Sequence, residues 1–284
     1  MSRPVMIFGA GQAGRACRRL LGPQWDVTAF LDNDRSKSSI LGIPVLPPEA
    51  ACGGAERVVI AVANPQRARS MASQLEDLGY SGEITFFSDY QALFDVRAAA
   101  ARLLAEHMEA DGVAGDIAEV GVFRGAFAAV LNGALPARTL HLFDTFEGFP
   151  GEQAALDREQ GFSAAAAGDF ADTSPQAVLS VLPHPEAAVI HQGVFPGTFA
   201  GLEQAHFCLV SLDADLYQPT LDALELFWPR LSAGGVVLLH DFNSAQYGGA
   251  GSAARAFCAG RGIVPVPLGD LHGTAVLVKQ GAQP

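Results

Sequence analysis

Short apolar runs alternate with helical patterns along the whole chain, and they fall into two series. The first series predicts about four strands, within RPVMIFG, DVTAFLDND, RVVIAVAN and EITFFSD. A glycine turn and a helical pattern closed by Gly22 follow the first strand, and the stretch from Gln66 to Leu78 also predicts a helix. This alternation is typical of an α/β fold with a parallel sheet, here a small N-terminal Rossmann-like domain.

The second series is longer and predicts seven strands. QALFDVRAAAARLLAEHMEA, residues 91–110, is rich in helix formers and predicts one long connecting helix, with the domain boundary near residue 95. The two domains are then residues 1–95 and 96–284. Helices or loops separate the first five strands as βαβ units require, whereas GDLHG alone joins the last two and predicts an antiparallel hairpin at one edge. The seven strands lie within DIAEVGV, TLHLFD, AAVIHQG, FCLVSLD, GGVVLLHD, GIVPVPL and TAVLVK.

Composition limits the class of protein. The 284 residues are 49% hydrophobic, enough for one or two cores, and no apolar run approaches the roughly 20 residues of a membrane span. No signal peptide precedes the first strand, and the four cysteines lack CxxC spacing. We therefore expect a cytoplasmic protein without membrane attachment. The sequence leaves open whether it is a homo-oligomer.

The negative charge is concentrated in the second domain. Residues 1–95 carry 9 basic and 10 acidic side chains, whereas residues 96–284 carry 9 basic and 20 acidic ones. Such a domain repels a phosphate backbone, which argues against a nucleic-acid partner, and it attracts a divalent cation.

Two strand ends of the second domain suggest a nucleoside-type site. EVGVFRG places Glu119 before Gly121 and Gly125, and these glycines allow a tight turn and close approach of a ligand. The next strand ends in Asp144, where a carboxylate can accept hydrogen bonds from ribose hydroxyls. The alternative for Asp144 is a turn or helix cap.

A second polar group ends the fourth and fifth strands. SLDADLYQPT contains Asp213 and Asp215, and the fifth strand ends in His240 and Asp241. Because neighbouring parallel strands end at the same edge of a sheet, these side chains should meet there and could hold a divalent ion. The alternative is a set of turn acids with a satisfied histidine.

These blocks together resemble the macrocin O-methyltransferase family over about residues 112–260. The similar blocks include IAEVGVFRGAFAAVLNGAL, LHLFDTFEGFP, GDFADTS, HQGVFPGTF and SLDADLYQPTLDALELFWPRLSAGGVVLLHDF. The resemblance implies a seven-stranded Rossmann-like methyltransferase sheet, with S-adenosylmethionine and magnesium as cofactors and a sugar hydroxyl of a natural product as methyl acceptor.

The resemblance also implies roles for individual residues. Cofactor-binding residues would be Glu119, Gly121, Gly125, Asp144, Thr145 and Phe146. The metal would be held by Asp213, His240 and Asp241. The family usually has two aspartates where this chain has His240–Asp241, and imidazole is a poor ligand for a hard ion. The metal therefore differs, the site is weaker, or His240 acts as a base.

The expected reaction is direct methyl transfer to a substrate oxygen. A divalent ion lowers the pKa of a bound hydroxyl, and a nearby base takes its proton. The candidate bases are Asp213, Asp215 and His240, and the sequence does not choose among them. The poorly patterned stretch from Asp144 to Gln176 predicts a lid or a plain insertion, and NSAQYGGAGS after Asp241 predicts a second flexible loop.

The first domain carries a separate motif. GAGQAG places Gly9, Gly11 and Gly14 between a strand and a helix, and Asp32 follows 18 residues later, as in a dinucleotide fingerprint. The domain also resembles the small Rossmann-like domains of sugar-modifying enzymes that bind nucleotide-sugars. Three interpretations compete: nucleotide or nucleotide-sugar binding, an unliganded scaffold or dimerisation module, and NAD binding.

The leading hypothesis is a metal-assisted O-methyltransferase acting on a sugar or glycosylated metabolite. The rival is a catalytically inactive nucleotide-sugar-binding or scaffold protein with a degenerate methyltransferase domain, supported by the His240 departure. An NAD-dependent sugar oxidoreductase would need a second half-fold and a Tyr–Lys pair, and the two lysines lie far from such a context.

Overall fold

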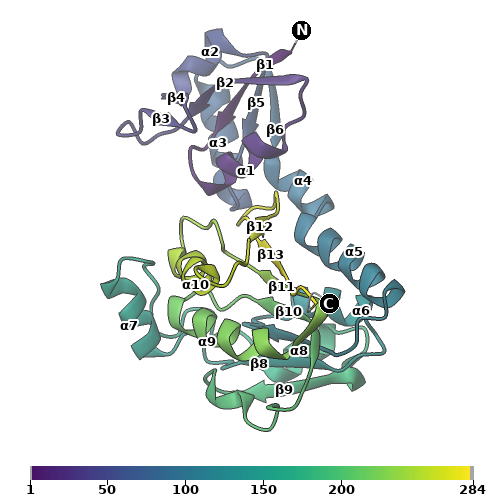
Figure 1. Cartoon of the computed structure of the whole chain (residues 1–284). Helices are drawn as coiled ribbons and strands as arrows, with labels where there is room; N and C mark the ends of the chain where they lie inside the picture. Colours follow the sequence, from purple (N-terminus) through teal and green to yellow (C-terminus); the bar gives the residue numbers. More distant parts are fainter. Residues whose placement is uncertain (1, 282–284) are drawn as a thin grey trace. The chain divides into compact units, whose positions relative to one another are not determined.

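A computed structural model describes residues 2–281, with the backbone alone for Ala92. The chain divides into two compact units (Figure 1). The first comprises the residues up to Asp95 together with Gly269–Leu271, and the second comprises Val96–Leu268 and the residues from His272 onward.

The first unit contains a six-stranded sheet in the order β3-β4-β2-β1-β5-β6. Its strands are parallel except β3, which pairs antiparallel with β4. The four predicted strands are present, and the short pair β3–β4 is an addition. The elements are β1 (Arg3–Phe8), α1 (Gln12–Leu20), β2 (Trp25–Leu31), β3 (Ser39–Ile40), β4 (Ile43–Leu46), η1 (Pro48–Ala50), α2 (Ala51–Gly54), β5 (Arg57–Ile60), α3 (Pro65–Asp77), β6 (Glu83–Phe86) and α4 (Phe87–Leu93).

The first unit has a three-layer core because alternate residues of its strands face opposite sides of the sheet. Val5 and Ile7 of β1 join a cluster with residues of α1, whereas Met6 and Phe8 join one with residues of α2 and α3. Asn64 begins α3 by accepting a hydrogen bond from the Arg67 backbone N–H. The sheet is therefore covered by helices on both faces.

The second unit contains a seven-stranded sheet in the order β12-β13-β11-β10-β7-β8-β9. Only β13 runs antiparallel to its neighbours, so the predicted seven-stranded sheet with a terminal hairpin is confirmed. The elements are α5 (Val96–Ala110), β7 (Asp116–Val120), α6 (Ala126–Ala134), β8 (Leu140–Asp144), α7 (Gly151–Glu159), α8 (Pro175–Val181), η2 (Pro185–Ala187), β9 (Ala188–Gln192), η3 (Gly197–Phe199), β10 (Phe207–Leu212), α9 (Tyr217–Phe227), η4 (Trp228–Arg230), β11 (Leu231–Leu239), α10 (Gly248–Cys258), β12 (Val266–Pro267) and β13 (Ala275–Val278).

The second sheet is also sandwiched between helices. Leu209 of β10 lies in a cluster with residues of α5, α6 and α8, and its neighbour Val210 lies in one with residues of α9 and α10. Because both faces are buried, β10 is a continuous apolar run rather than an alternating one. Polar groups therefore lie at the carboxyl ends of β7, β8, β10 and β11 rather than on the two faces of the sheet.

Three local predictions were wrong. The single helix over residues 91–110 is two helices, α4 and α5, because the chain is extended at Phe94. The stretch after Asp144 is not irregular throughout, since it contains α7. Half of NSAQYGGAGS is the first turn of α10, which begins at Gly248.

Among residues 2–281, no helix has both the length and the apolar character needed to cross a membrane.

Candidate active site

The parallel pairing of β7, β10 and β11 brings their carboxyl ends to one level. Leu212 of β10 pairs with Val120 of β7 and Leu239 of β11. The residues that follow these three positions therefore meet at the same edge, as the sequence predicts. Asp215 and Asp241 beyond this edge have positive φ values of 61° and 56°. Backbone conformations of this kind cost energy in residues other than glycine and cluster at functional sites.

Asp213 is held between two basic side chains. Its Oδ2 accepts a hydrogen bond of 2.7 Å from Arg97 of α5, and its Oδ1 lies 2.8 Å from His240 Nδ1. Arg97 also donates to the Ser211 hydroxyl at 2.8 Å and lies over the Phe127 ring. Arg97 was missed at the sequence level because it lies in an alanine-rich helix far from any motif.

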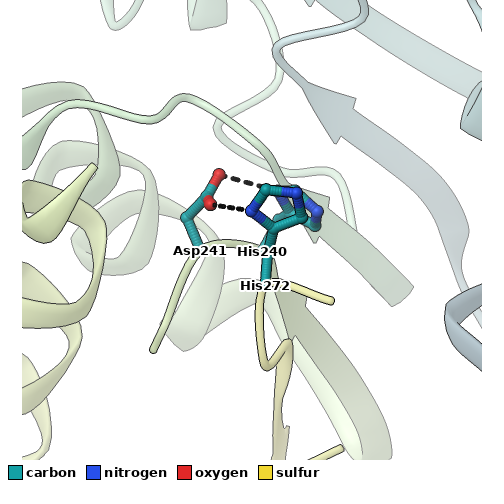
Figure 2. Close-up of side chains that lie close together, drawn as sticks. All are labelled: His240, Asp241 and His272. Atoms are coloured by element: carbon teal, nitrogen blue, oxygen red, sulfur yellow. Dashed lines mark hydrogen bonds and ion pairs between the residues drawn. The ribbon is translucent and has the colours of Figure 1, made fainter. Parts of the chain in front are cut away.

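A second group links the fifth strand to the turn before β13 (Figure 2). His240 Nδ1 lies 2.7 Å from Asp241 Oδ2, and His272 Nδ1 lies 3.0 Å from Asp241 Oδ1. The two imidazole rings are 4.8 Å apart. His272 was also missed, since its loop GDLHG indicates only a hairpin connection.

Asp215 completes a carboxylate cluster. Asp213, Asp215 and Asp241 each offer an oxygen within 4.8 Å of the others, as do suitable atoms of His240, Asp241 and His272. The five side chains come from three segments: the ends of β10 and β11 and the turn before β13. The cluster thus has the oxygen and nitrogen atoms of a cation site.

The charges in this cluster depend on one another. Burial opposes ionisation of Asp213, but His240 and Arg97 outweigh it and hold its pKa at about 2. Burial also opposes protonation of His240, but Asp213 and Asp241 raise its pKa to about 10. Burial and the other two carboxylates raise the pKa of Asp215 well above its usual range. Asp215 is therefore the carboxylate of the cluster with the greatest affinity for a proton.

Glu119 lies inside the neighbouring strand β7. It is 1% exposed, and its Oε2 has no hydrogen-bond partner among residues 2–281. Burial raises its pKa to about 8 against the opposing effect of Arg97. A buried acceptor without a partner is expensive unless a ligand supplies a donor.

This burial predicts an unusual pH dependence of stability. Because the folded-state pKa of Glu119 is raised, its protonated form is favoured by folding, and stability should fall as pH rises from about 4.5 to 8. Glu119→Gln should flatten this slope and raise the unfolding free energy at pH 8 by about 1–3 kcal/mol. Thermal unfolding of the cofactor-free protein at several pH values measures this, and an unchanged slope would contradict the assignment.

The two glycines of this turn have structural roles. Gly121 has φ +82°, and a Cβ there would lie 2.1 Å from the Asp213 carbonyl oxygen. Gly125, with φ +77°, precedes α6, and a Cβ there would lie 3.0 Å from Val178. Gly121 therefore allows the end of β7 to approach the end of β10, which aligns the two groups of site residues.

Asp144 organises the turn after β7. Its Oδ2 accepts hydrogen bonds from the backbone N–H groups of Val122 (2.7 Å) and Phe123 (2.9 Å), and its Oδ1 accepts one from Phe146 (2.8 Å). The Phe146 side chain is buried in the core, and the Thr145 hydroxyl donates to the Gly148 carbonyl. The side chains of the DTF triplet thus shape this edge of the site.

A cavity of about 470 Å³ lies between the segment after α7 and the segment after β11. It is lined by residues 161–165, Asp169 and residues 245–247, so the two predicted loops do meet. Residues 245–247 follow Asp241 closely in sequence, so this wall of the cavity belongs to the segment that begins at the end of β11. The volume of the cavity is within the range of small-molecule sites.

The wall of the cavity is anchored by a buried acid. Asp157 of α7 accepts hydrogen bonds from the Tyr217 backbone N–H (2.8 Å) and the Ser163 hydroxyl (3.1 Å). It therefore caps α9, whose first turn follows Asp215. Tyr217 in turn stacks on Phe162.

In the first unit, the residues of the GAGQAG–Asp32 fingerprint largely pack against one another and against neighbouring backbone. A Cβ at Gly9 would lie 2.4 Å from the Ala61 carbonyl oxygen, and one at Gly14 would lie 1.9 Å from that of Gly9. Asp32 Oδ2 accepts hydrogen bonds from the Ala10 N–H and Lys37 Nζ, both at 2.9 Å. Only Gly11 of the three glycines has open space beside it.

Residues 90–280 match the sequence profile of the macrocin O-methyltransferase family, TylF. The chain belongs to this family. Its members are S-adenosylmethionine-dependent O-methyltransferases, and the matched residues include the whole strand-end cluster. The predicted family and enzyme class are confirmed.

Two curated relatives are named as O-methyltransferases, and the first name specifies a rhamnosyl-bearing substrate. The 8-demethyl-8-(2,3-dimethoxy-alpha-L-rhamnosyl)-tetracenomycin-C 4'-O-methyltransferase of Streptomyces olivaceus is 30% identical over 197 residues, 62% of this chain and 70% of the relative. The mycinamicin III 3''-O-methyltransferase of Micromonospora griseorubida is 28% identical over 144 residues, 46% of this chain and 57% of the relative.

Solved structures support the fold. The O-methyltransferase NovP superposes with a TM-score of 0.53 at 22% identity, covering 65% of this chain and 80% of NovP. The calicheamicin methyltransferase CalS11 has the same TM-score at 20% identity, covering 76% of this chain and 86% of its own. The family resemblance therefore extends to the three-dimensional arrangement.

Proposed function

We propose that the chain transfers a methyl group from S-adenosylmethionine to a hydroxyl of a sugar or glycosylated metabolite, assisted by a divalent ion. The main support is the family match over residues 90–280, together with the 470 Å³ cavity, one wall of which belongs to the segment that follows Asp241. The rhamnosyl group in the name of the Streptomyces olivaceus relative supports the acceptor class.

The cofactor would supply the electrophilic methyl carbon of a sulfonium ion. Glu119 and the turn from Gly121 to Gly125 are the residues proposed to hold it. The partnerless Oε2 of Glu119 fits this role, because a cationic group of the cofactor would satisfy the buried acceptor.

A divalent ion would supply positive charge that lowers the pKa of the acceptor hydroxyl. Asp213, His240 and Asp241 are its proposed ligands, and magnesium is the ion that the family implies. The donors fit an ion, because Asp241 Oδ1 is buried without a hydrogen-bond partner among residues 2–281. The ion would displace the proton of His240, since metal ligands must be deprotonated.

Asp215 is the proposed base. Asp213 contacts Arg97 and His240, and His240 contacts two carboxylates, whereas Asp215 is bordered mainly by other acids. These acids and burial raise its pKa, and a base with a pKa nearer neutrality accepts a proton more readily.

Narrowing the cavity tests the acceptor site. Ala164 is exposed and lines the cavity, so Ala164→Trp should raise the KM for a rhamnosyl glycoside acceptor about tenfold or more by occupying its space. Affinity for S-adenosylmethionine, measured by calorimetry, should not change. Ala166→Trp, at an exposed position outside the lining, is the matched control. Equal KM values in the two variants would contradict this acceptor site.

For residues 1–95 the proposal has two forms: a nucleotide or nucleotide-sugar-binding module, or a scaffold. Open space at Gly11 supports binding, whereas the engagement of Asp32 with its own loop and Lys37 supports a scaffold. Calorimetry of the full chain with nucleotide-sugars and NAD distinguishes them. If S-adenosylmethionine does not bind, the inactive scaffold becomes the better proposal for the whole chain.

A further inference from the structure

We infer that His272 is a ligand of the divalent ion and that this chain's site prefers an imidazole-binding transition-metal ion to Mg²⁺. The inference rests on the proposed function, because it concerns the ion of the same site. The inference adds His272 to the proposed ligands and replaces Mg²⁺ with a transition-metal ion.

The contact between Asp241 and His272 is the first observation. Asp241 Oδ1 and His272 Nδ1 lie 3.0 Å apart, yet neither atom has a hydrogen-bond partner among residues 2–281. Asp241 is only 2% exposed, so water does not readily compensate its free oxygen. The two atoms form an ion pair when His272 is protonated, and a cation bound between the same two donors could replace that proton.

The spacing of the donor atoms suits a metal ion. Two ligands on adjacent corners of an octahedron, each about 2.1 Å from the ion, lie roughly 3.0 Å apart. The Asp241–His272 distance is 3.0 Å, and His240 Nδ1 lies 2.7 Å and 2.8 Å from the carboxylates of Asp241 and Asp213. A single ion can therefore be reached by His240, Asp241 and His272, whose donor atoms lie within 4.8 Å of one another, and Asp213 adjoins this set through its contact with His240.

His272 is held in place by its backbone. The Asn243 N–H donates to the His272 carbonyl oxygen at 3.2 Å. Gly273 has φ +65°, and a Cβ there would lie 2.8 Å from Asn243 Cβ. The turn before β13 is thus packed against the segment after β11, and His272 needs no rearrangement to remain beside Asp241.

The carboxylates are oriented as metal ligands usually are. Arg97 occupies Asp213 Oδ2 and leaves Oδ1 facing His240. A partner of this kind fixes a ligating carboxylate in its productive orientation.

Two imidazole ligands change which metal ion the site prefers. Carboxylate oxygens suit Mg²⁺, whereas imidazole nitrogens suit Zn²⁺, Co²⁺ and similar ions, whose affinities for mixed nitrogen and oxygen sites are much higher. A set containing His240, Asp241 and His272 together with Asp213 offers both kinds of donor. We therefore expect selection of a transition-metal ion.

Metal titration of the purified, chelator-treated full chain tests the preference. Calorimetry with Co²⁺ and with Mg²⁺ should give a Kd for Co²⁺ at least about 100-fold lower. The visible absorption of Co²⁺ should also change on binding, which reports nitrogen coordination independently of catalysis. Equal affinities for the two ions would overturn the inference.

Two substitutions of His272 separate ligand from structure. His272→Ala should weaken Co²⁺ binding by about 10–100-fold or more and alter the Co²⁺ spectrum, with a much smaller effect on Mg²⁺. His272→Asp should restore an oxygen donor and narrow the difference between the two ions. His107→Ala, at an exposed position of α5, is the control and should change neither.

The outcomes distinguish this inference from the proposed function. An unchanged Co²⁺ affinity and spectrum in a folded His272→Ala protein overturns the role of His272, whether or not methyl transfer occurs with Mg²⁺. Loss of Co²⁺ binding in His272→Ala supports the metal site. If the wild type also methylates no sugar acceptor, the proposed function is removed while the metal site stands.

Discussion

Asp213→Asn should reduce methyl transfer by about 10³-fold or more, because several kcal/mol of charge stabilisation are lost at the acceptor oxygen. The carboxylate contacts both Arg97 and His240, at 2.7 Å and 2.8 Å. An amide preserves the volume but removes the charge, and its N–H₂ group cannot accept from either neighbour. Initial rates with labelled S-adenosylmethionine measure the loss.

Cofactor binding separates a local from a global effect of this substitution. Asp213 follows β10 and is not part of the glycine turn that follows β7, so calorimetry should give nearly the wild-type affinity for S-adenosylmethionine. Thermal unfolding should show a destabilisation, since breaking a buried ion pair costs roughly 3–5 kcal/mol, and the rates are therefore compared well below the unfolding temperature. Asp111→Asn, at an exposed position, is the matched control.

Two results would remove Asp213 from the reaction. One is a wild-type transfer rate in the folded Asp213→Asn protein. The other is full activity of the wild type in excess chelator, which would leave Asp213 with only its ion pairs to Arg97 and His240.

The presence of most strands of the second unit was predictable because it depends on local patterns. Most of these strands contain a short apolar run, and the position of Asp213 and Asp241 at the ends of two neighbouring strands brings them to one edge. Parallel pairing of the two strands is sufficient to bring these residues together, so no information about side-chain contacts is needed.

Arg97 and His272 were not predictable in the same way. Arg97 reaches Asp213 across 116 positions of sequence, and its helix shows no motif. His272 approaches Asp241 only because β13 is inserted beside β11. Their roles depend on tertiary packing, and a lone basic residue in a helix or hairpin gives no local signal of it.

Two of the errors in secondary structure differ in origin. Alanine-rich sequence favours a helix from 91 to 110, yet Phe94 is extended and ends α4. The helix α7 has a weak pattern of its own and is fixed by the contact of Asp157 with α9. A tertiary contact thus outweighs weak local propensity at α7, whereas Phe94, whose side chain is largely exposed, is extended without such a packing reason.

Asp144→Ala should weaken S-adenosylmethionine binding by about 100-fold or more, because the turn that would hold the cofactor loses its central acceptor. The carboxylate accepts three backbone hydrogen bonds, from Val122, Phe123 and Phe146. Phe123 and Phe146 have φ values of +50° and +57°, which are strained for bulky residues and persist only when neighbouring groups enforce them. Calorimetry measures the affinity, and thermal unfolding should show a loss of about 3 kcal/mol or more.

The ligand used in the titration distinguishes the two roles of Asp144. If the carboxylate also contacts the ribose, Asp144→Asn should lose more affinity for adenosine than for methionine, because only adenosine carries the ribose hydroxyls. If it only orders the turn, both ligands should weaken together. Glu106→Ala, at an exposed position of α5, is the control for removing a carboxylate away from this turn. A folded Asp144→Ala protein that binds S-adenosylmethionine as tightly as the wild type would exclude both roles, and the cofactor would then have to bind elsewhere than at this strand end.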